Sequence, residues 1–309
     1  MARASRRRFS LGAGALGIAG LTGLAGLACR GPRSAGTPDA SAGSAKKLPK
    51  LPLPELTLVS YNVLADPVRV SERFPPLFEL LARLDPDIIA LQEVTDWIAR
   101  LIHEQPWAQA YHASTLGGRR AHPGGQYILS KRPILRSRSL ALPGRQRRTA
   151  LFSTIAARED VELTVVTTHL ESFLEDGPLR ARQLDAIFEA LMIEDEAVLL
   201  GDFNFGDGEL EEGSINAEFD DLWKQLRPQE PGFTWDIERS EMARAGSFTG
   251  EPSRRLDRVL LRSELWTGGS IEIIGDEPVH AGKLDLFPSD HFGLVATLKP
   301  AGCGECARR

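Results

Sequence analysis

Acidic, amide and imidazole side chains gather in six short motifs along this chain of 309 residues. The motifs are, in order, Ser60-Tyr61-Asn62, Leu91-Gln92-Glu93, Thr168-His169-Leu170-Glu171-Ser172, Gly201-Asp202-Phe203-Asn204, Arg255-Leu256-Asp257-Arg258 and Ser289-Asp290-His291. Hydrolysing a phosphate ester requires positive charge on the phosphate, an activated water and help for the departing oxygen. Amides, histidines and carboxylates could provide these together with a hard divalent metal, so the residue set predicts metal-assisted phosphoester hydrolysis.

Four of these residues have chemistry that suits a metal and a reacting water. Glu93 is the candidate ligand for Mg²⁺ or Mn²⁺, because these ions prefer carboxylate oxygens. Asn62 could steady the metal shell or a phosphate oxygen through its side-chain amide. Asp202 is the candidate general base. Asn204, two residues later, could hold Asp202 in place or donate to the phosphate.

Two histidines complete the candidate set. His169 and His291 could bond the transition-state oxygens, or act as acid or base near neutral pH. Either Asp257 or Asp290 could orient His291, and the sequence leaves open which of them does so and which lies near the metal. Taken singly, Asn62 or Gly201-Asp202-Phe203-Asn204 could form a turn, Ser289-Asp290-His291 a helix cap or loop, and His169 could be a buried core histidine. Their joint occurrence in one order favours a shared site.

The motifs end or follow short apolar runs that are typical of buried strands. Strands are expected near 55–63, 87–92, 126–130, 134–141, 150–157, 161–169, 197–202, 256–262, 270–275 and 292–298. Helices are expected near 73–84, 95–104, 178–193 and 217–226. Tight links between strands predict antiparallel pairs, and helical crossovers predict some parallel pairing. Polar residues at several strand ends would then meet in one pocket.

From about Glu55 to Pro300 the chain resembles the endonuclease/exonuclease/phosphatase superfamily, which has the DNase I-like fold. Within it, the sequence is most similar to the magnesium-dependent 5′-tyrosyl-DNA phosphodiesterases. The stretches that carry this likeness are Thr168-His169-Leu170-Glu171-Ser172, Arg180-Ala181-Arg182-Gln183-Leu184, Phe233-Thr234-Trp235-Asp236, Arg255-Leu256-Asp257-Arg258 and Phe287-Pro288-Ser289-Asp290-His291-Phe292-Gly293-Leu294. The resemblance implies an α/β fold of two mixed sheets packed face to face with outer helices, a four-layer sandwich.

The same resemblance implies roles for single residues. Glu93 would bind the metal and Asp202 would be the catalytic acid or base. The residues implied around the scissile phosphate are Asn62, Asn204, Ser172 and His291. The chain departs from the eukaryotic enzymes at its first motif, where they have Thr-Trp-Asn, and at Gly206, where they carry an arginine. Because that arginine would contact substrate phosphate, the resemblance supports hydrolysis and leaves the substrate open.

The first 54 residues have a different composition from the rest of the chain. Residues 1–28 resemble a twin-arginine export signal, with Arg6-Arg7-Arg8-Phe9-Ser10-Leu11 followed by an apolar segment rich in Gly, Ala and Leu. The many glycines argue against a membrane span. Cys29 follows directly and could carry a lipid anchor, with simple cleavage after Ala28 as the alternative. Residues 29–54 are rich in Pro, Gly, Ser and Ala, which predicts a flexible linker.

These features predict the organisation and location of the protein. Residues 55–300 would form the catalytic domain, and residues 301–309 a tail in which Cys303 and Cys306 could form a small disulfide. We expect an exported bacterial protein that is periplasmic, lipid-anchored or secreted. We also expect a monomer that contacts the membrane only through a lipid on Cys29.

The charge distribution constrains the substrate. Residues 55–300 hold 26 basic and 40 acidic side chains, a net charge of −14, so most of the surface should repel a long polyanion. Residues 105–158 contain ten Arg or Lys and no acid, and could form a basic rim beside the pocket or solvated strand edges. This favours a phosphodiesterase or nuclease that engages a phosphate or a nucleic acid end. The alternatives are a phospholipid or phosphoinositide phosphoesterase and an inactive surface-binding module.

Overall fold

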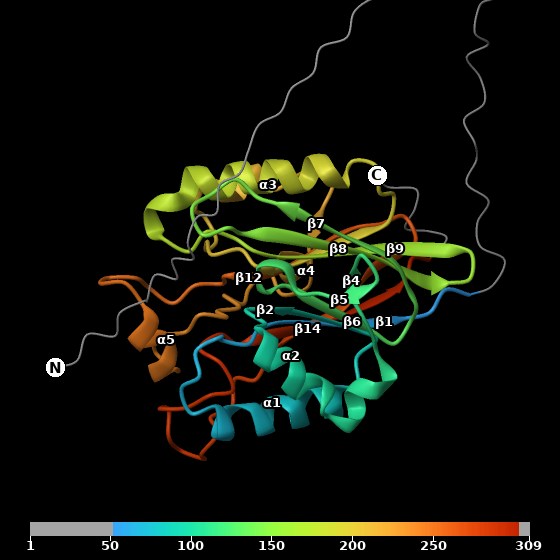
Figure 1. The fold of residues 1–309 in the computed structure, drawn as a ribbon. Coiled ribbons are helices and arrows are strands. Elements are labelled where there is room, and N and C mark those ends of the chain that lie inside the picture. The colour runs from blue at the N-terminus through green and yellow to red at the C-terminus, as the bar shows by residue number, and fades with distance from the viewer. Residues whose placement is uncertain (1–51, 303–309) are drawn as a thin grey trace, which may run out of the picture. The chain divides into compact units, whose positions relative to one another are not determined.

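The computed structural model describes residues 52–302 (Figure 1). The expected export signal, Cys29, nearly all of the expected linker, and Cys303 and Cys306 lie outside the described residues. Within residues 52–302, none of the helices combines the length and the apolar character needed to cross a membrane.

Two six-stranded mixed sheets form the centre of the fold. The first sheet has the order β13-β14-β1-β2-β6-β3, and its strands are β1 (Leu56–Asn62), β2 (Ile88–Gln92), β3 (His112–Ala113), β6 (Tyr127–Ser130), β13 (Trp266–Ile274) and β14 (Gly293–Pro300). The second sheet has the order β11-β12-β10-β9-β8-β7, and its strands are β7 (Ile134–Ala141), β8 (Thr149–Arg158), β9 (Val161–His169), β10 (Ala197–Asp202), β11 (Asp220–Asp221) and β12 (Asp257–Arg262). A separate hairpin joins β4 (Thr115–Leu116) to β5 (Arg119–Arg120).

Alternation of apolar side chains along the strands explains the layers. Leu58 of the first sheet and Leu200 of the second belong to one buried cluster between the sheets. Val59, the next residue along β1, packs on the outer side with α1 (Val70–Leu84) and α2 (Asp96–His103). Leu199 likewise packs outward, against α3 (Gly177–Leu191). Figure 1 shows α3 on one side of the sheets and α1 and α2 on the other, which confirms the expected four-layer sandwich.

Most expected elements are present, and several short segments differ from the prediction, among them the unexpected strands β3, β4 and β5. The helix expected at 217–226 is wrong in its first half, because Asp220–Asp221 pair with β12 and only α4 (Leu222–Leu226) is helical. The Asp221 carboxylate accepts from the backbone N–H groups of Trp223 and Lys224 and so fixes the helix start there. The short helix α5 (Glu241–Gly246), capped by Ser240, was not expected. Single 3₁₀ turns occur at Pro106–Ala110, Pro123–Gly125, Leu174–Asp176 and Leu210–Ser214.

A buried ion cluster holds the loop that follows β10. The guanidinium of Arg255 donates to Asp207 at 3.0 Å and to Asp221 at 2.8 Å. Arg258 donates to the same two carboxylates at 3.1 and 3.0 Å. Both arginine side chains are fully buried, so each needs its acidic partners. The cluster therefore anchors the chain between Asn204 and α4 to the second sheet.

Asp207→Asn tests how much this cluster stabilises the fold. Burial raises the pKa of the Asp207 carboxyl, but the two arginines outweigh it and hold that pKa well below its usual range. A carboxyl with a lowered folded-state pKa stabilises the protein above its unfolded pKa of about 4, and this stabilisation is lost as the pH falls further. Because the Asp207 side chain is 41% exposed and Asp221 remains, we expect a loss of only about 1 kcal/mol at pH 7.

Urea unfolding at several pH values measures this effect. The difference in unfolding free energy between wild type and Asp207→Asn should shrink as the pH falls from about 4 to about 2. Asp185→Asn on the exposed face of α3 is the matched control and should unfold like the wild type. A difference for Asp207→Asn that stays constant over this pH range would contradict the assignment.

Candidate active site

The ends of strands in both sheets bring the sequence motifs together. In the first sheet, Asn62 at the end of β1 lies beside Gln92 at the end of the parallel strand β2, and Glu93 follows directly. In the second sheet, Asp202 at the end of β10 pairs with His169 of β9 on one side and with Asp257 of β12 on the other. Each sheet therefore contributes one half of a polar centre.

Asn62 joins the two halves. Its side-chain Nδ2 donates to Asp202 Oδ2 at 3.0 Å and to Glu93 Oε1 at 3.3 Å. His169 makes a second connection, with Nε2 3.2 Å from Asp202 Oδ2 and Nδ1 3.8 Å from Glu93 Oε1. The carboxylates of the two sheets are thus linked through one amide and one imidazole.

The backbone at two of these positions has a conformation that aims the side chain. Glu93 has φ 63° and Asn204 has φ 56°, a left-handed region that is uncommon for residues other than glycine. Glu93 Oε2 accepts from the backbone N–H of Ala65 at 2.8 Å. The backbone N–H of Asn204 donates to Asp202 Oδ1 at 2.9 Å, and its side chain donates to the carbonyl of Leu170 at 3.0 Å. Strained backbone of this kind is concentrated at functional sites.

Asp257, rather than Asp290, orients His291. Nδ1 of His291 lies 2.9 Å from Asp257 Oδ2, and Nε2 points toward Asp202 Oδ2 at 3.6 Å. The backbone N–H of Asp257 is fixed by the hydroxyl of Thr234 at 3.0 Å. The indole ring of Trp235 packs against the imidazole, with ring centroids 4.9 Å apart. Neighbouring residues of one segment therefore hold both members of the Asp257–His291 pair.

Asp290 lies instead next to Ser289 in the segment that leads into β14. The Ser289 hydroxyl is 3.2 Å from Asp290 Oδ1 and 2.6 Å from the carbonyl oxygen of Asn62. Burial raises the pKa of Asp290, and the charge of Glu93 adds to this shift, while His291 opposes it. Asp290 therefore lies within electrostatic range of Glu93, and its position is compatible with a role near a metal.

Burial and charge shift the pKa values of the two central residues in useful directions. Burial raises the pKa of Asp202 to about 6, although the neighbouring His291 and the hydrogen bond from Asn62 oppose the shift. Burial alone would lower the pKa of His291, but Asp202 and Asp257 outweigh it and raise this pKa to about 10. At neutral pH the centre therefore holds an imidazolium beside a carboxylate, a donor and an acceptor within reach of each other.

Two sets of side chains could hold a divalent metal. In the first set the Glu93 carboxylate offers hard oxygen ligands and is 28% exposed, which leaves room for metal-bound water, whereas Asn62 Oδ1 accepts from the backbone N–H of Leu64 at 3.1 Å and its Nδ2 donates to Glu93. Asp202, Asp257 and His291 form a second set, whose ligand atoms lie within 4.8 Å of one another. The members of that set already bond each other, and Asp202 is 1% exposed. The residues around Glu93 therefore fit Mg²⁺ or Mn²⁺ better.

Ser172 is placed on the loop that follows His169. Its hydroxyl accepts from the Gln146 side chain at 3.0 Å, and its backbone N–H donates to the same side chain at 2.9 Å. The buried guanidinium of Arg180 donates to the carbonyls of Glu171 and Phe173 on either side of Ser172. Gln146 and Arg180 therefore fix the loop beside Asn204, which bonds the carbonyl of Leu170.

Two contributors to the centre could not be assigned from their own motifs. Arg148, in the loop before β8, lies close enough for its charge to help lower the pKa of Asp202. Trp235 packs on His291. The acid-free stretch 105–158 was the available signal for Arg148, but that stretch does not form one rim. Lys131 and Arg136 pair with acidic side chains at 2.7 and 2.8 Å, outside the polar centre.

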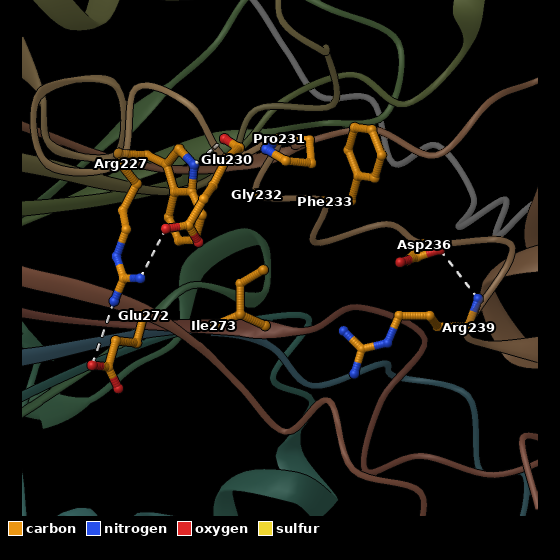
Figure 2. A pocket seen from close by; sticks show the side chains of 10 residues that line it. Arg227, Glu230, Pro231, Gly232, Phe233, Asp236, Arg239, Glu272 and Ile273 are labelled. Atoms are coloured by element: carbon orange, nitrogen blue, oxygen red, sulfur yellow. Dashed lines mark hydrogen bonds and ion pairs between the residues drawn. The ribbon is translucent and has the colours of Figure 1, made fainter.

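A hollow of about 300 Å³ lies along the segment that precedes Thr234 and Trp235. Figure 2 shows Phe233 and Arg239 on one side of it and Arg227 and Glu272 on the other. Arg227 is paired with Glu230 at 3.0 Å, and Arg239 with Asp276 at 2.8 Å. Its arginines are already neutralised, so this hollow offers little attraction to an anionic group.

Known proteins are similar to this chain in sequence. The sequence pattern of the Endonuclease/Exonuclease/phosphatase family matches residues 59–291. Tyrosyl-DNA phosphodiesterase 2 from Danio rerio is 26% identical over 254 residues, which are 79% of this chain and 66% of that protein. The human protein of the same name is also 26% identical, over 78% of this chain and 67% of its own length. The chain thus spans about two thirds of the length of these relatives.

Solved structures agree with the sequence comparison. The structure of D. rerio TDP2 complexed with a single-strand DNA product has a TM-score of 0.68 and 26% identity, and covers 79% of this chain and 99% of that one. The human Nocturnin catalytic domain has a TM-score of 0.61 at 18% identity, covering 80% of this chain and 94% of that one, and shares the fold. With the family pattern spanning most of the described residues, the chain belongs to the Endonuclease/Exonuclease/phosphatase family.

Proposed function

We propose that the protein is a divalent-metal-dependent phosphodiesterase. The observation that carries this proposal is the continuous network that runs from Glu93 through Asn62 and Asp202 to His291 and Asp257. It combines an oxygen-ligand set, a buried carboxylate with a raised pKa and a charged imidazole. These are the three components that hydrolysis of a phosphodiester requires.

Each residue then has a chemical task. Glu93 and Asn62 would hold Mg²⁺ or Mn²⁺, which when bound polarises a phosphate oxygen and makes water more acidic. Asp202 accepts a proton from the attacking water. His291, held by Asp257, donates from Nε2 to the phosphate or the leaving oxygen. His169, which lies beside Asp202 and Glu93, could donate a hydrogen bond to an oxygen of the transition state.

Asn204 and Ser172 complete the set around the phosphate. Their side chains lie on the loops that follow β10 and β9, where their amide and hydroxyl groups could donate to phosphate oxygens. Asn204 also fixes Asp202 through its backbone N–H, so its replacement would disturb both functions.

A nucleic acid end is the substrate that the relatives suggest. The proteins named tyrosyl-DNA phosphodiesterase 2 and the complex with a DNA product support a 5′-tyrosyl-DNA-like specificity. Gly206 stands where those enzymes carry an arginine that would contact the substrate phosphate. The proposed substrates therefore include nucleic acid ends without a tyrosyl group. Export and a lipid on Cys29 are proposed from residues 1–29, and mass spectrometry of the mature N-terminus tests them.

Hydrolysis of a substrate panel tests the proposal directly. The panel contains bis(4-nitrophenyl) phosphate, a 5′-phosphotyrosyl oligonucleotide, plain single-stranded DNA, a phosphoinositide and sphingomyelin, each with Mg²⁺, Mn²⁺ or EDTA. We expect metal-dependent turnover of the diester and of the nucleic acid substrates. Turnover of the lipids alone would show that the substrate is a phospholipid rather than a nucleic acid. If no compound were hydrolysed, the protein would instead be interpreted as an inactive binding module.

The pH profile of turnover follows from the two shifted pKa values. Asp202 must be deprotonated to accept a proton, so kcat/KM should rise as the pH passes about 6. His291 must stay protonated to donate, so kcat/KM should fall as the pH approaches about 10. Asp257→Asn removes one of the charges that raise the pKa of His291, so the alkaline limb of the profile should move to lower pH. An alkaline limb that does not move would exclude this role for Asp257.

A further inference from the structure

A second hollow lies beside Glu93, on the α2 side of the first sheet. It has a volume of about 660 Å³. Its lining residues come from α2, from β5 and from the segment that leads into β6, and they are Asp96, Ala99, Arg100, His103, Glu104, Arg120, His122 and Tyr127. Nothing described so far gives this hollow a task.

Backbone contacts place the hollow next to the proposed metal ligand. The backbone N–H of Val94 donates to the carbonyl of Gly125 at 2.8 Å. A Cβ on Gly125 would lie only 3.2 Å from Glu93 Cα, so the two backbones touch. Gly125 stands between His122 and Tyr127 in the chain, and Asp96 comes three residues after Glu93. A substrate held by Glu93 could therefore continue into this hollow.

The arginines of the hollow differ from those of the hollow in Figure 2. Within residues 52–302, no ion pair joins Arg100 or Arg120 to an acidic side chain. Arg120 lines the hollow, and its charge contributes, after burial, to lowering the pKa of His103. Burial raises the pKa of Tyr127 to about 12, and the charge of Arg120 opposes this rise. Two guanidinium groups that form no ion pair within the described residues therefore remain available to an anionic ligand.

Flat polar rings form another part of the lining. His103 lies 2.6 Å from the Tyr127 hydroxyl, and the rings of His103 and His122 stand nearly perpendicular to the Tyr127 ring, at 84° and 88°. Imidazole and guanidinium planes are surfaces on which nucleobases stack in single strands. The volume also exceeds what a bare phosphate needs. Shape and chemistry together therefore fit a nucleotide rather than an inorganic anion.

Two carboxylates at the edge do not exclude this ligand. Asp96 is 93% exposed and lies 3.0 Å from His122 Nε2. Glu104 is exposed directly after the last residue of α2, where solvent and salt screen its charge. Carboxylates can also accept hydrogen bonds from the amino groups of bases.

We propose that this hollow, with Arg100 and Arg120 as its anion-binding groups, holds a nucleotide of a single-stranded nucleic acid whose phosphate lies at the Glu93 centre. This inference rests on the proposed function and adds the polymer contact beyond the reacting phosphate. It assigns a binding task to Arg120 that the catalytic residues do not share.

The test measures binding separately from hydrolysis. A fluorescein-labelled oligothymidine of about 12 nucleotides is titrated with the full-length protein in EDTA, so that it is bound without being cut. Arg120→Gln should weaken binding about tenfold and lower the slope of log affinity against log salt by about 0.7. Arg119→Gln removes the same charge from the neighbouring position of the hairpin, outside the hollow, and is the matched control.

The outcomes separate the inference from the proposed function. Equal affinities and salt slopes for Arg120→Gln and Arg119→Gln would overturn the inference, and so would a wild type that binds no oligothymidine or binds only anionic lipid vesicles. Weaker binding by Arg120→Gln alone supports it, even if no phosphodiester is hydrolysed. Turnover of bis(4-nitrophenyl) phosphate by the wild type tests the proposed function independently, because this small diester carries no nucleotide to occupy the hollow. Both arginines are exposed, so neither substitution threatens folding.

Discussion

Asp202→Asn should lower metal-dependent turnover of bis(4-nitrophenyl) phosphate by about 10³-fold, while the protein remains folded. Asparagine keeps the size of the side chain and an oxygen that can accept from Asn62, but it cannot take a proton from water. Loss of the Asp202 charge should also lower the pKa of His291, since that carboxylate is the main group that raises it. Steady-state kinetics with Mg²⁺ or Mn²⁺ at neutral pH measure the effect.

The control for Asp202→Asn must distinguish lost chemistry from lost structure. Thermal unfolding followed by circular dichroism should give a folded protein, because the replacement removes a costly buried charge and its amide oxygen keeps one of the two hydrogen bonds that Asp202 accepts from Asn62 and Asn204. Asp195→Asn is the matched control. It replaces a carboxylate in the turn before β10, near the other end of the same strand. If Asp202→Asn kept most of its metal-dependent activity, the general-base role would have to be given up.

Glu93→Gln should weaken the binding of Mn²⁺ by at least about tenfold, with a matching loss of activity at low metal concentration. The carboxylate carries the charge that a hard divalent cation needs, and a neutral amide of the same shape offers only a weak oxygen ligand. Titration calorimetry with Mn²⁺ measures the affinity directly, without reference to turnover.

Asp96→Asn is the matched control for Glu93→Gln. It removes one carboxylate three residues away, on an exposed helix start, and should leave the affinity for Mn²⁺ unchanged. If Glu93→Gln bound Mn²⁺ as the wild type does while Asp202→Asn did not, the metal would belong to the set formed by Asp202, Asp257 and His291.

The strand ends could be predicted because they combine two local signals. Apolar runs locate β1, β2, β9 and β10 in the sequence, and a polar residue closes each run. Asn62 and Asp202 were therefore identifiable as neighbours, although 140 residues separate them. The hydrogen bond between their side chains required only that the two sheets pack with the same ends aligned.

The partner of His291 could not be chosen from the sequence, because Asp257 and Asp290 both lie at strand boundaries. The choice depends on the register of β12 against β10, which places Asp257 directly opposite Asp202. That register is fixed by long-range pairing rather than by local pattern. The contacts of Trp235 and Arg148 depend in the same way on loops that are far from the motifs in sequence.

Short elements escaped prediction for a related reason. A two-residue strand such as Asp220–Asp221 carries no periodicity, and its acidic side chains favour a helix start or a turn. Its pairing with β12 is stabilised by tertiary ion pairs with Arg255 and Arg258, which no local window contains. The energy that decides this segment therefore comes from residues more than thirty positions away.

The antiparallel pairing of the first and last strands has a practical consequence. Leu56 at the start of β1 lies opposite Leu298 near the end of β14, whereas Asn62 closes the other end of β1. At about 3.3 Å per residue, the strand carries the polar centre about 20 Å away from both of these ends. A bead, a fluorophore or a fused protein attached beside Leu56 or Leu298 would therefore lie at the opposite end of the sheet from the catalytic residues. Such attachments should leave the approach of substrate open, which makes either end suitable for immobilising the enzyme.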